Sequence, residues 1–98
     1  MQVKIQRSYR DIVAICDSEL LGKRFEEGKF QLDIKESFYK GEEKTKSEVL
    51  DVIKKMSIED ATFNIVGKEA TNTALEAGII SKQGIKEIQG IPFALVLL

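Results

Sequence analysis

The chain of 98 residues has the length of one small domain, and its 43% apolar and 32% charged residues provide a core together with a soluble surface. Fifteen basic and sixteen acidic residues give a net charge of -1, which removes the general positive field of non-specific nucleic-acid and membrane binders. No run approaches about 20 apolar residues, and no signal-peptide pattern follows Met1. We therefore expect a single globular domain, residues 1–98, in the cytoplasm and without a membrane partner.

Residues needed for several kinds of chemistry are missing. The chain has no histidine, and its single cysteine, Cys16, can form neither an internal disulfide nor a thiolate metal site. Neither a phosphate-binding loop nor a dinucleotide fingerprint occurs. We therefore predict no cofactor and no metal, and we expect Cys16 to be a core residue with a raised pKa.

The first part of the chain has the pattern of a β-hairpin. Residues 2–7 alternate between polar and apolar side chains, and residues 12–16 are continuously apolar, as in a strand covered on both faces. The polar break at residues 8–11 predicts the turn between them.

One further strand is expected before the first helix. Residues 17–22 suggest a turn or a single helical turn, and residues 23–28 a charged connector. Residues 29–34 alternate, which directs Phe30, Leu32 and Ile34 inward. Residues 37–44 are expected to form a loop.

Two helices are predicted. The hydroxyl of Thr45 and the carboxylate of Glu48 have the spacing of a capping box, and Val49, Ile53 and Met56 follow on one face of a helix over residues 45–56. The stretch Phe63–Ile80 reads as a buried strand, a tight turn at Gly67, a helix over residues 68–77 and a left-handed stop at Gly78.

The end of the chain completes the sheet. Residues 85–89 suggest a strand, and residues 93–98 are so apolar that an edge position is not expected. The predicted fold is α+β or α/β: a single mixed sheet of five to six strands with two helices packed on it. The order strand, helix, strand predicts a right-handed crossover if the two strands are parallel.

A small basic cluster supplies the ingredients for RNA contacts. Tyr9 and Arg10 lie in the predicted hairpin turn, and Lys23 and Arg24 lie in the charged connector. Cationic side chains contact phosphates and an exposed aromatic ring stacks on bases. Coverage of the hairpin by Tyr9 and ordinary surface charge are the competing interpretation.

The turn at Gly67 is a candidate anion site. Free amides of Lys68, Glu69 and Ala70 at a helix start attract an anion, and the side chains of Asn64 and Lys68 would add donors. Glu69 opposes this hypothesis, because its own negative charge satisfies the helix dipole.

Carboxylates offer a third kind of site. Asp17 and Glu19 follow a buried strand, and Glu26 and Glu27 lie on the nearby connector. They could bind a hard cation or act as acid and base, but capping and solvation explain the same positions.

Four strings of residues resemble an uncharacterised, mainly archaeal family, domain of unknown function 424. They are Arg7–Ala14, Leu20–Gly28, Asn64–Gly67 and Gly90–Ala94, and the resemblance covers nearly the whole chain. It implies an archaeal cytoplasmic protein, with a link to RNA or translation as an expectation. It carries no catalytic residues to this sequence.

The first functional hypothesis is a non-catalytic module that binds RNA or a ribonucleoprotein in translation, through Tyr9, Arg10, Lys23, Arg24 and Lys68. It requires the hairpin turn, the connector and the Gly67 turn to share one surface. The alternative is a protein-interaction or self-assembling module, whose apolar end, residues 93–98, is completed by a partner strand. An enzyme using Asp17, Glu19 or Glu26 ranks last.

Overall fold

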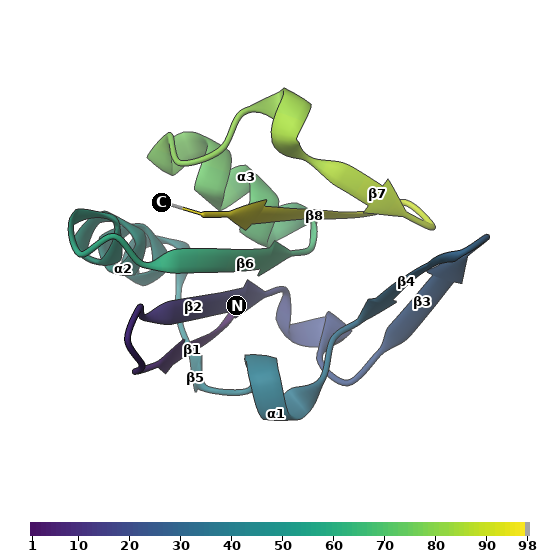
Figure 1. Cartoon of the computed structure of the whole chain (residues 1–98), viewed down its shortest axis with the longest axis horizontal. Helices are drawn as coiled ribbons and strands as arrows, with labels where there is room; N and C mark the ends of the chain where they lie inside the picture. The colour runs from purple at the N-terminus through teal and green to yellow at the C-terminus, as the bar shows by residue number, and fades with distance from the viewer. Residues whose placement is uncertain (98) are drawn as a thin grey trace.

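The computed structural model describes residues 1–97, which form a six-stranded mixed sheet, a separate two-stranded hairpin and two longer helices (Figure 1). In chain order the elements are β1 (Gln2–Gln6), β2 (Ile12–Cys16), the 3₁₀ turn η1 (Ser18–Leu20), β3 (Arg24–Glu27), β4 (Phe30–Asp33), α1 (Glu36–Tyr39), β5 (Glu42–Glu43), α2 (Lys46–Ile58), β6 (Thr62–Val66), α3 (Lys68–Ala77), the 3₁₀ turn η2 (Lys82–Gly84), β7 (Lys86–Ile88) and β8 (Ile91–Val96). The predicted α+β class, with one mixed sheet and two helices on it, is confirmed.

The main sheet has the strand order β5-β1-β2-β6-β8-β7. β1 and β2 form the predicted antiparallel hairpin, and β2 runs parallel to β6 with Ile12 opposite Thr62 and Cys16 opposite Val66. β8 is antiparallel to β6. The β1–β2 turn therefore lies at one end of the sheet, while the chain leaves β2 and β6 toward Asp17 and Gly67 at the other.

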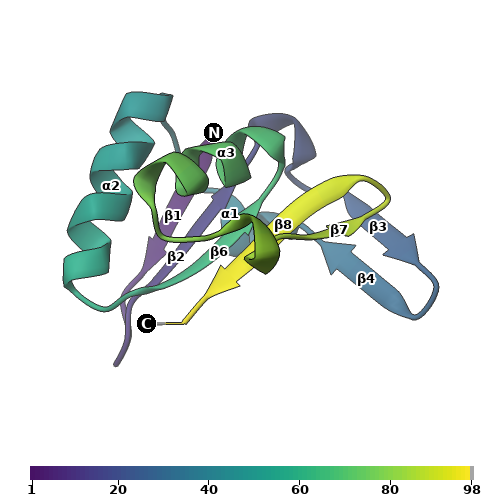
Figure 2. The same ribbon diagram turned by 90° about the horizontal axis from the view of Figure 1, so that it is seen from above.

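Helices α2 and α3 cover one face of the sheet (Figure 2). The capping box is present: Thr45 N–H donates to the Glu48 carboxylate at 2.9 Å, and the Glu48 amide donates to the Thr45 hydroxyl at 3.2 Å. α2 buries the three predicted side chains, Val49, Ile53 and Met56. They pack against strand residues of the same face, which include Val13, Ile15, Phe63, Ile65 and Val96.

Helix α3 lies close to the sheet because its buried face is built from small side chains, Ala70 and Ala74 among them. It ends at Gly78, which has the left-handed φ of 80°. The amides of Gly78 and Ile79 donate to the carbonyls of Leu75 and Ala74, the pair of bonds that defines a Schellman motif, and the predicted left-handed stop at Gly78 is confirmed.

The opposite face of the sheet is covered only in part. Leu32, Ile34 and Tyr39 come from β4, the following loop and α1, and they pack on Cys16 and Val66 near the strand ends. Residues 36–39, expected within or beside a loop, thus form one helical turn that closes this second core. Leu95, which pairs with Asn64 on this face, is 59% exposed and is not part of the second core, so residues 1–97 leave this part of the face uncovered.

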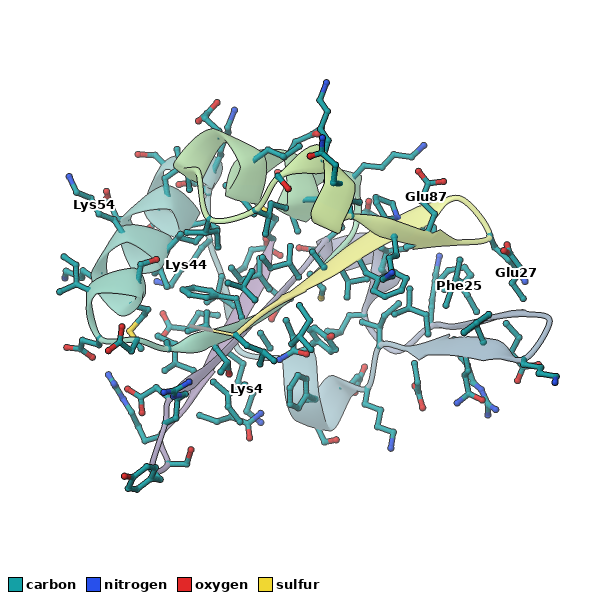
Figure 3. All side chains as sticks on the ribbon, turned by 45° about the horizontal axis from the view of Figure 1, so that its top comes forward. Lys4, Phe25, Glu27, Lys44, Lys54 and Glu87 are labelled. Carbon is teal, nitrogen blue, oxygen red and sulfur yellow. The ribbon has the colours of Figure 1, made fainter. Side chains whose placement is uncertain are left out.

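The sequence predicts a charged connector over residues 23–28, and this prediction is wrong for Arg24–Glu27, which forms strand β3. It pairs with β4 in a two-stranded sheet of its own, so the third predicted strand does not join the main sheet. Charged side chains are tolerated there because both strands of this hairpin face solvent along most of their length. Figure 3 shows Glu27 near the β7–β8 turn, where its carboxylate accepts the amide of Gln89 at 2.8 Å.

The last strand differs from the expectation in its position. β7 covers only Ile91–Phe93 of β8, so the rest of β8 lies at an edge of the sheet. The apolar composition of residues 93–98 predicted an interior strand, and this is right only at Phe93, which pairs with Lys86 of β7, and wrong for residues 94–96. Leu98, part of the predicted strand, lies outside the described residues.

Candidate functional site

The corner after β6 is held by a buried carboxylate from the neighbouring strand. Asp17, 4% exposed, follows β2 and accepts the amides of Glu69 at 3.1 Å and Ala70 at 2.8 Å. Its own amide donates to the carbonyl of Val66 at 3.0 Å, which continues the parallel pairing by one residue. Asp17 therefore acts as the N-terminal cap of α3 across the sheet.

Gly67 makes this contact possible. Its φ of 112° lies in a region that side chains avoid, and a Cβ at this position would overlap the Asp17 carboxyl group. The sharp turn predicted between Val66 and Lys68 is confirmed.

The geometry of the Gly67 turn weakens the hypothesis of an anion site. The amides of Glu69 and Ala70 were expected to be free, and this is wrong, since both donate to Asp17. Asn64 lies on the sheet face opposite the helices, because its neighbours Phe63 and Ile65 belong to the helix-side core. Anion binding by Asn64, Gly67 and Lys68 stays a prediction, and an anion would have to displace a built-in carboxylate.

The basic residues of the sequence hypothesis do not share one surface. Arg10 lies before Ile12 at one end of the sheet, whereas Lys68 begins α3 at the other. Lys23 and Arg24 follow η1 at the Lys68 end. Arg24 pairs with Glu26 at 2.9 Å and donates to the Gln31 side chain at 2.7 Å within its own hairpin.

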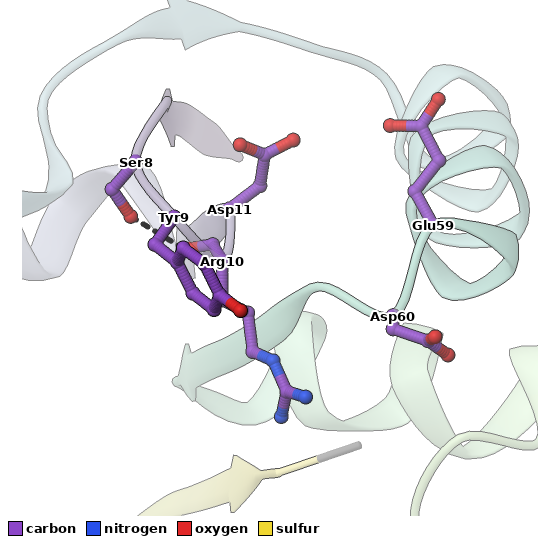
Figure 4. Close-up of a pocket in the computed structure, with 6 residues that line it drawn as sticks. All are labelled: Ser8, Tyr9, Arg10, Asp11, Glu59 and Asp60. Carbon is purple, nitrogen blue, oxygen red and sulfur yellow. Dashed lines mark hydrogen bonds between the residues drawn. The ribbon is translucent and has the colours of Figure 1, made fainter.

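Around the β1–β2 turn, carboxylates offset the arginines. A depression of about 440 Å³ is lined by Ser8–Asp11 and by Glu59 and Asp60 of the α2–β6 loop (Figure 4). Arg7 pairs with Asp11 at 2.5 Å and with Glu59 at 3.8 Å. The ring of Tyr9 is fully exposed at 109% of its reference area. This end of the sheet is thus a mixed-charge surface with one aromatic ring.

The residues proposed for acid–base chemistry are used structurally or lie apart. Asp17 caps α3, and Glu26 pairs with Arg24. Between residues 1 and 97, no group of three or more His, Cys, Asp or Glu side chains is placed to hold a metal ion. Cys16 is fully buried, and burial together with the charge of Asp17 raises its pKa to about 11, so the thiol is protonated at neutral pH.

The sequence points to the open edge of β8 only through the alternative hypothesis, in which a partner strand completes residues 93–98. The Gly67 amide donates to the Pro92 carbonyl, so the backbone groups of Pro92, Ala94 and Val96 face β6. Those of Ile91, Phe93 and Leu95 therefore face outward, and β7 pairs with the first two. Within the described chain, no backbone hydrogen bond fills the outward side of Leu95.

Side chains on this stretch are apolar and exposed. Leu95 is 59% and Leu97 71% exposed, and by alternation both lie on the uncovered face beside Asn64. The other outer strands are protected: β5 consists of Glu42 and Glu43, and β7 carries Lys86 and Glu87. Charged residues on edge strands prevent association of sheets, and residues 91–97 contain none.

These features define a small α+β domain with a cross-strand helix cap and an open, uncharged strand edge. The chain belongs to the family described as protein of unknown function (DUF424), whose model matches residues 6–98. It is similar to an uncharacterized conserved protein from Methanopyrus kandleri, for which a crystal structure is known. The two share 24% sequence identity with a TM-score of 0.85, over 98% of this chain and 90% of that one.

That likeness shows the fold alone. No match was found among curated proteins. Of the helices within residues 1–97, none is both long and apolar enough to cross a membrane.

Proposed function

We propose that this protein is a non-catalytic protein-interaction module that accepts a strand from a partner along the open edge of β8. The observation that supports this function is the combination at Leu95 of unfilled outward backbone groups and an exposed apolar side chain. An added strand provides main-chain hydrogen bonds, and its alternate side chains would pack beside Leu95 and Leu97. We place the module in the cytoplasm, which suits a free buried thiol.

Energetics favour such an addition only if the partner is extended and apolar. Each new backbone hydrogen bond contributes about 1 kcal/mol net, and burial of the leucine side chains adds about 25 cal/mol per Å². The entropy lost when the partner strand becomes ordered opposes both contributions. A short edge therefore suits a reversible, regulated complex better than a permanent one.

Strand addition is tested with a soluble probe peptide of alternating threonine and valine residues, titrated into labelled protein and followed by NMR. We expect chemical-shift changes confined to β8 and its neighbours, with slower hydrogen exchange of the Leu95 amide. Leu95→Pro removes the outward N–H without breaking a bond to β6, and it should abolish these changes.

The matched control is Ile58→Lys, because Ile58 is a similarly exposed apolar residue, 79%, at the end of α2. This variant should bind the probe like the wild type. Equal binding by the Leu95→Pro variant, or shifts that centre on α2 and α3, would contradict strand addition at β8.

A second candidate function is the binding of RNA or a ribonucleoprotein in translation, at the β1–β2 turn. The exposed ring of Tyr9 beside Arg10 supports it, since such a ring can stack on an unpaired base. The carboxylates of Asp11, Glu59 and Asp60 oppose it by repelling phosphates.

This candidate is tested by titrating single-stranded and transfer RNA at several salt concentrations. RNA binding through Arg10 predicts affinity that falls as salt rises, together with a loss for Tyr9→Ala and Arg10→Ala. A variant at the far end of the sheet, Lys68→Ala, serves as the control and should bind normally. Binding that is independent of salt, or equally reduced by Lys68→Ala, would remove the β1–β2 turn as the site.

A further inference from the structure

We infer that the depression between the β1–β2 turn and the α2–β6 loop binds a guanine base. This site is independent of strand addition at β8. With RNA as the source of the base, the inference rests on the second candidate function and names the base that is recognised. Three groups that line the depression match different parts of guanine: the ring of Tyr9, the guanidinium of Arg10 and the carboxylate of Asp60 (Figure 4).

The depression has the size and lining of a site for a small planar molecule. Its volume of about 440 Å³ falls within the range of roughly 300–1,000 Å³ that is usual for small-molecule sites. Residues 8–11 form one side, and Glu59 and Asp60 lie across from them. All of these side chains are polar, and Tyr9 adds an aromatic ring. A fitting ligand therefore has hydrogen-bonding edges and a flat face, which describes a nucleobase.

Asp60 occupies a position where the fold favours a different residue. Its amide donates to the Ser57 carbonyl at 3.2 Å, and the Ala61 amide donates to the Met56 carbonyl at 3.1 Å. Asp60 is thus the left-handed residue that ends α2, with a φ of 57°. Glycine is the usual residue there, and the negative end of the helix dipole disfavours a carboxylate. The carboxylate therefore costs stability, which favours a role outside the fold.

The other two carboxylates of the depression are paired within the fold. Arg7 forms ion pairs with Asp11 at 2.5 Å and with Glu59 at 3.8 Å. Within the described part of the chain, no hydrogen bond or ion pair uses the Asp60 carboxylate. Its two oxygens can therefore accept hydrogen bonds from a ligand.

Guanine is the base whose edges match these groups. Its Watson–Crick edge carries two adjacent donors, N1–H and the N2 amino group, which one carboxylate accepts together. Adenine and cytosine place a ring-nitrogen acceptor beside their amino group, and uracil places its one donor between two carbonyls, so a carboxylate would face a lone pair. The O6 and N7 acceptors of guanine are the preferred partners of an arginine, here Arg10.

Tyr9 supplies the stacking face. Its side chain is exposed at 109% of its reference area, so the ring covers no part of the hairpin. An aromatic ring stacks on any base and adds affinity without selecting among bases, so the selection depends on Asp60 and Arg10. Three carboxylates and two arginines leave this end of the sheet slightly negative, which suits an uncharged base better than a polyphosphate.

Guanine binding is tested by NMR titration of labelled protein with guanosine, inosine and adenosine monophosphates, which share the same ribose and phosphate. We expect shifts at residues 8–11, Glu59 and Asp60. Guanosine monophosphate should bind about tenfold more tightly than adenosine monophosphate. Inosine monophosphate lacks the N2 amino group but keeps N1–H, so its affinity should lie between the two.

Asp60→Asn isolates the carboxylate, because asparagine has the same shape and readily adopts the left-handed conformation. The change replaces one acceptor by a donor, so the preference for guanosine over adenosine monophosphate should be lost. The urea midpoint of unfolding should rise, because a negative charge leaves the end of α2. Asp51→Asn, at an exposed position of α2, is the matched control and should keep the preference.

Tyr9→Ala tests the stacking face separately. It should weaken the binding of all three nucleotides by a similar factor, roughly tenfold, because stacking does not depend on the base. A loss confined to guanosine monophosphate would contradict the role given to the ring.

Short RNAs distinguish the two sources of the base. Single-stranded RNAs of uridines with one central guanosine or one central adenosine differ in a single base. Tighter binding of the guanosine RNA than of guanosine monophosphate identifies an unpaired RNA residue as the ligand. Equal or weaker binding identifies the free nucleotide.

The remaining outcomes separate this inference from the proposed functions. Equal affinities for the three nucleotides, or a preference that survives Asp60→Asn, overturn the guanine site. A urea midpoint that falls in Asp60→Asn would mean that the carboxylate serves the fold. RNA binding that requires Tyr9 and Arg10 but shows no preference for guanosine overturns the guanine site and leaves the second candidate function intact. If neither nucleotides nor RNA bind, both are wrong, while strand addition at β8 is decided by the probe peptide alone.

Discussion

At the scale of single residues, two positions decide how the ends of β2 and β6 are joined. Asp17 satisfies the first amides of α3 from outside the helix, and Gly67 leaves room for that carboxylate. Neither residue works without the other: a side chain at position 67 would displace the carboxylate, and the helix start would then lose its cap. The corner is therefore a structural joint in which the helix dipole is already neutralised.

Substitution of Gly67 by alanine should destabilise the protein by about 3 kcal/mol, the sum of backbone strain and a lost helix cap. Gly28→Ala is the matched control, because Gly28 also has a positive φ, 60°, but has no atom within 4 Å of an added Cβ. It should cost about 1 kcal/mol. Urea unfolding of both variants measures the difference. Equal losses would show that the overlap with Asp17 is relieved at no cost.

The Cys16 thiol should be unreactive in the folded protein. Burial and the neighbouring Asp17 raise its pKa to about 11, and the side chain has no exposed surface. A disulfide reagent at neutral pH should therefore modify Cys16 at the rate at which the protein unfolds, and rapidly in concentrated urea. Fast modification under native conditions would mean that local opening exposes the end of β2.

At the scale of elements, features that depend on neighbouring residues were predicted correctly, and pairings between distant residues were not. The capping box of Thr45 and Glu48 and the glycine stop at Gly78 depend on residues within one turn, so the sequence predicts them directly. Strand β3 is highly charged and pairs only with β4, which hides it from a pattern search. The cap from Asp17 joins residues more than fifty positions apart, and no local pattern indicates it.

The N-terminus of α2 should contribute stability that depends on pH. The hydrogen bond from the Thr45 amide, followed by that from its hydroxyl, lowers the pKa of Glu48 below its usual 4.5 in the folded state. A lowered folded pKa adds stability that is complete above the unfolded pKa and is lost as pH falls through the folded value. The stability difference between wild type and Glu48→Gln should therefore be present at neutral pH and shrink under acid conditions below about pH 4.5.

Urea unfolding of both proteins across this pH range provides the measurement. The Glu43 carboxylate, whose pKa is also lowered, chiefly by the amino group of Met1, titrates in both and cancels in the difference. Glu19→Gln is the control for the loss of one exposed carboxylate. A Glu48→Gln difference that stays constant with pH would mean that the ionised form is not preferred by the cap.

At the scale of the whole molecule, the sequence does not predict how much of each sheet face the surrounding elements cover. The apolar pattern identifies both faces of β2 and β6, and it places the helices correctly. It does not reveal that α1 and the β3–β4 hairpin cover only one end of the second face, because that depends on a two-stranded unit standing apart from the sheet (Figure 1). The uncovered remainder, beside Leu95, is the surface to which we assign the function.

The same division into layers predicts that the β3–β4 hairpin opens at a lower free energy than the main sheet. β3 and β4 form a two-stranded hairpin, which is marginal unless it packs on another element. Gln89 ties it to the β7–β8 turn, since its amide donates to the Glu27 carboxylate and its side chain to the Glu26 carbonyl. Amides of β3 and β4 should exchange with solvent by local opening that is insensitive to low urea concentrations. Amides of β2 and β6 should exchange only on global unfolding.

Native-state hydrogen exchange on wild type and Gln89→Ala tests this division. Removal of the Gln89 side chain should speed the exchange of β3 and β4 amides several-fold, because one of the two bonds to the turn is lost, and leave β2 and β6 unchanged. Gln83→Ala, in the exposed turn η2, is the matched control. Equal acceleration in all strands would show that the hairpin and the main sheet unfold together, and the molecule would then be one cooperative unit.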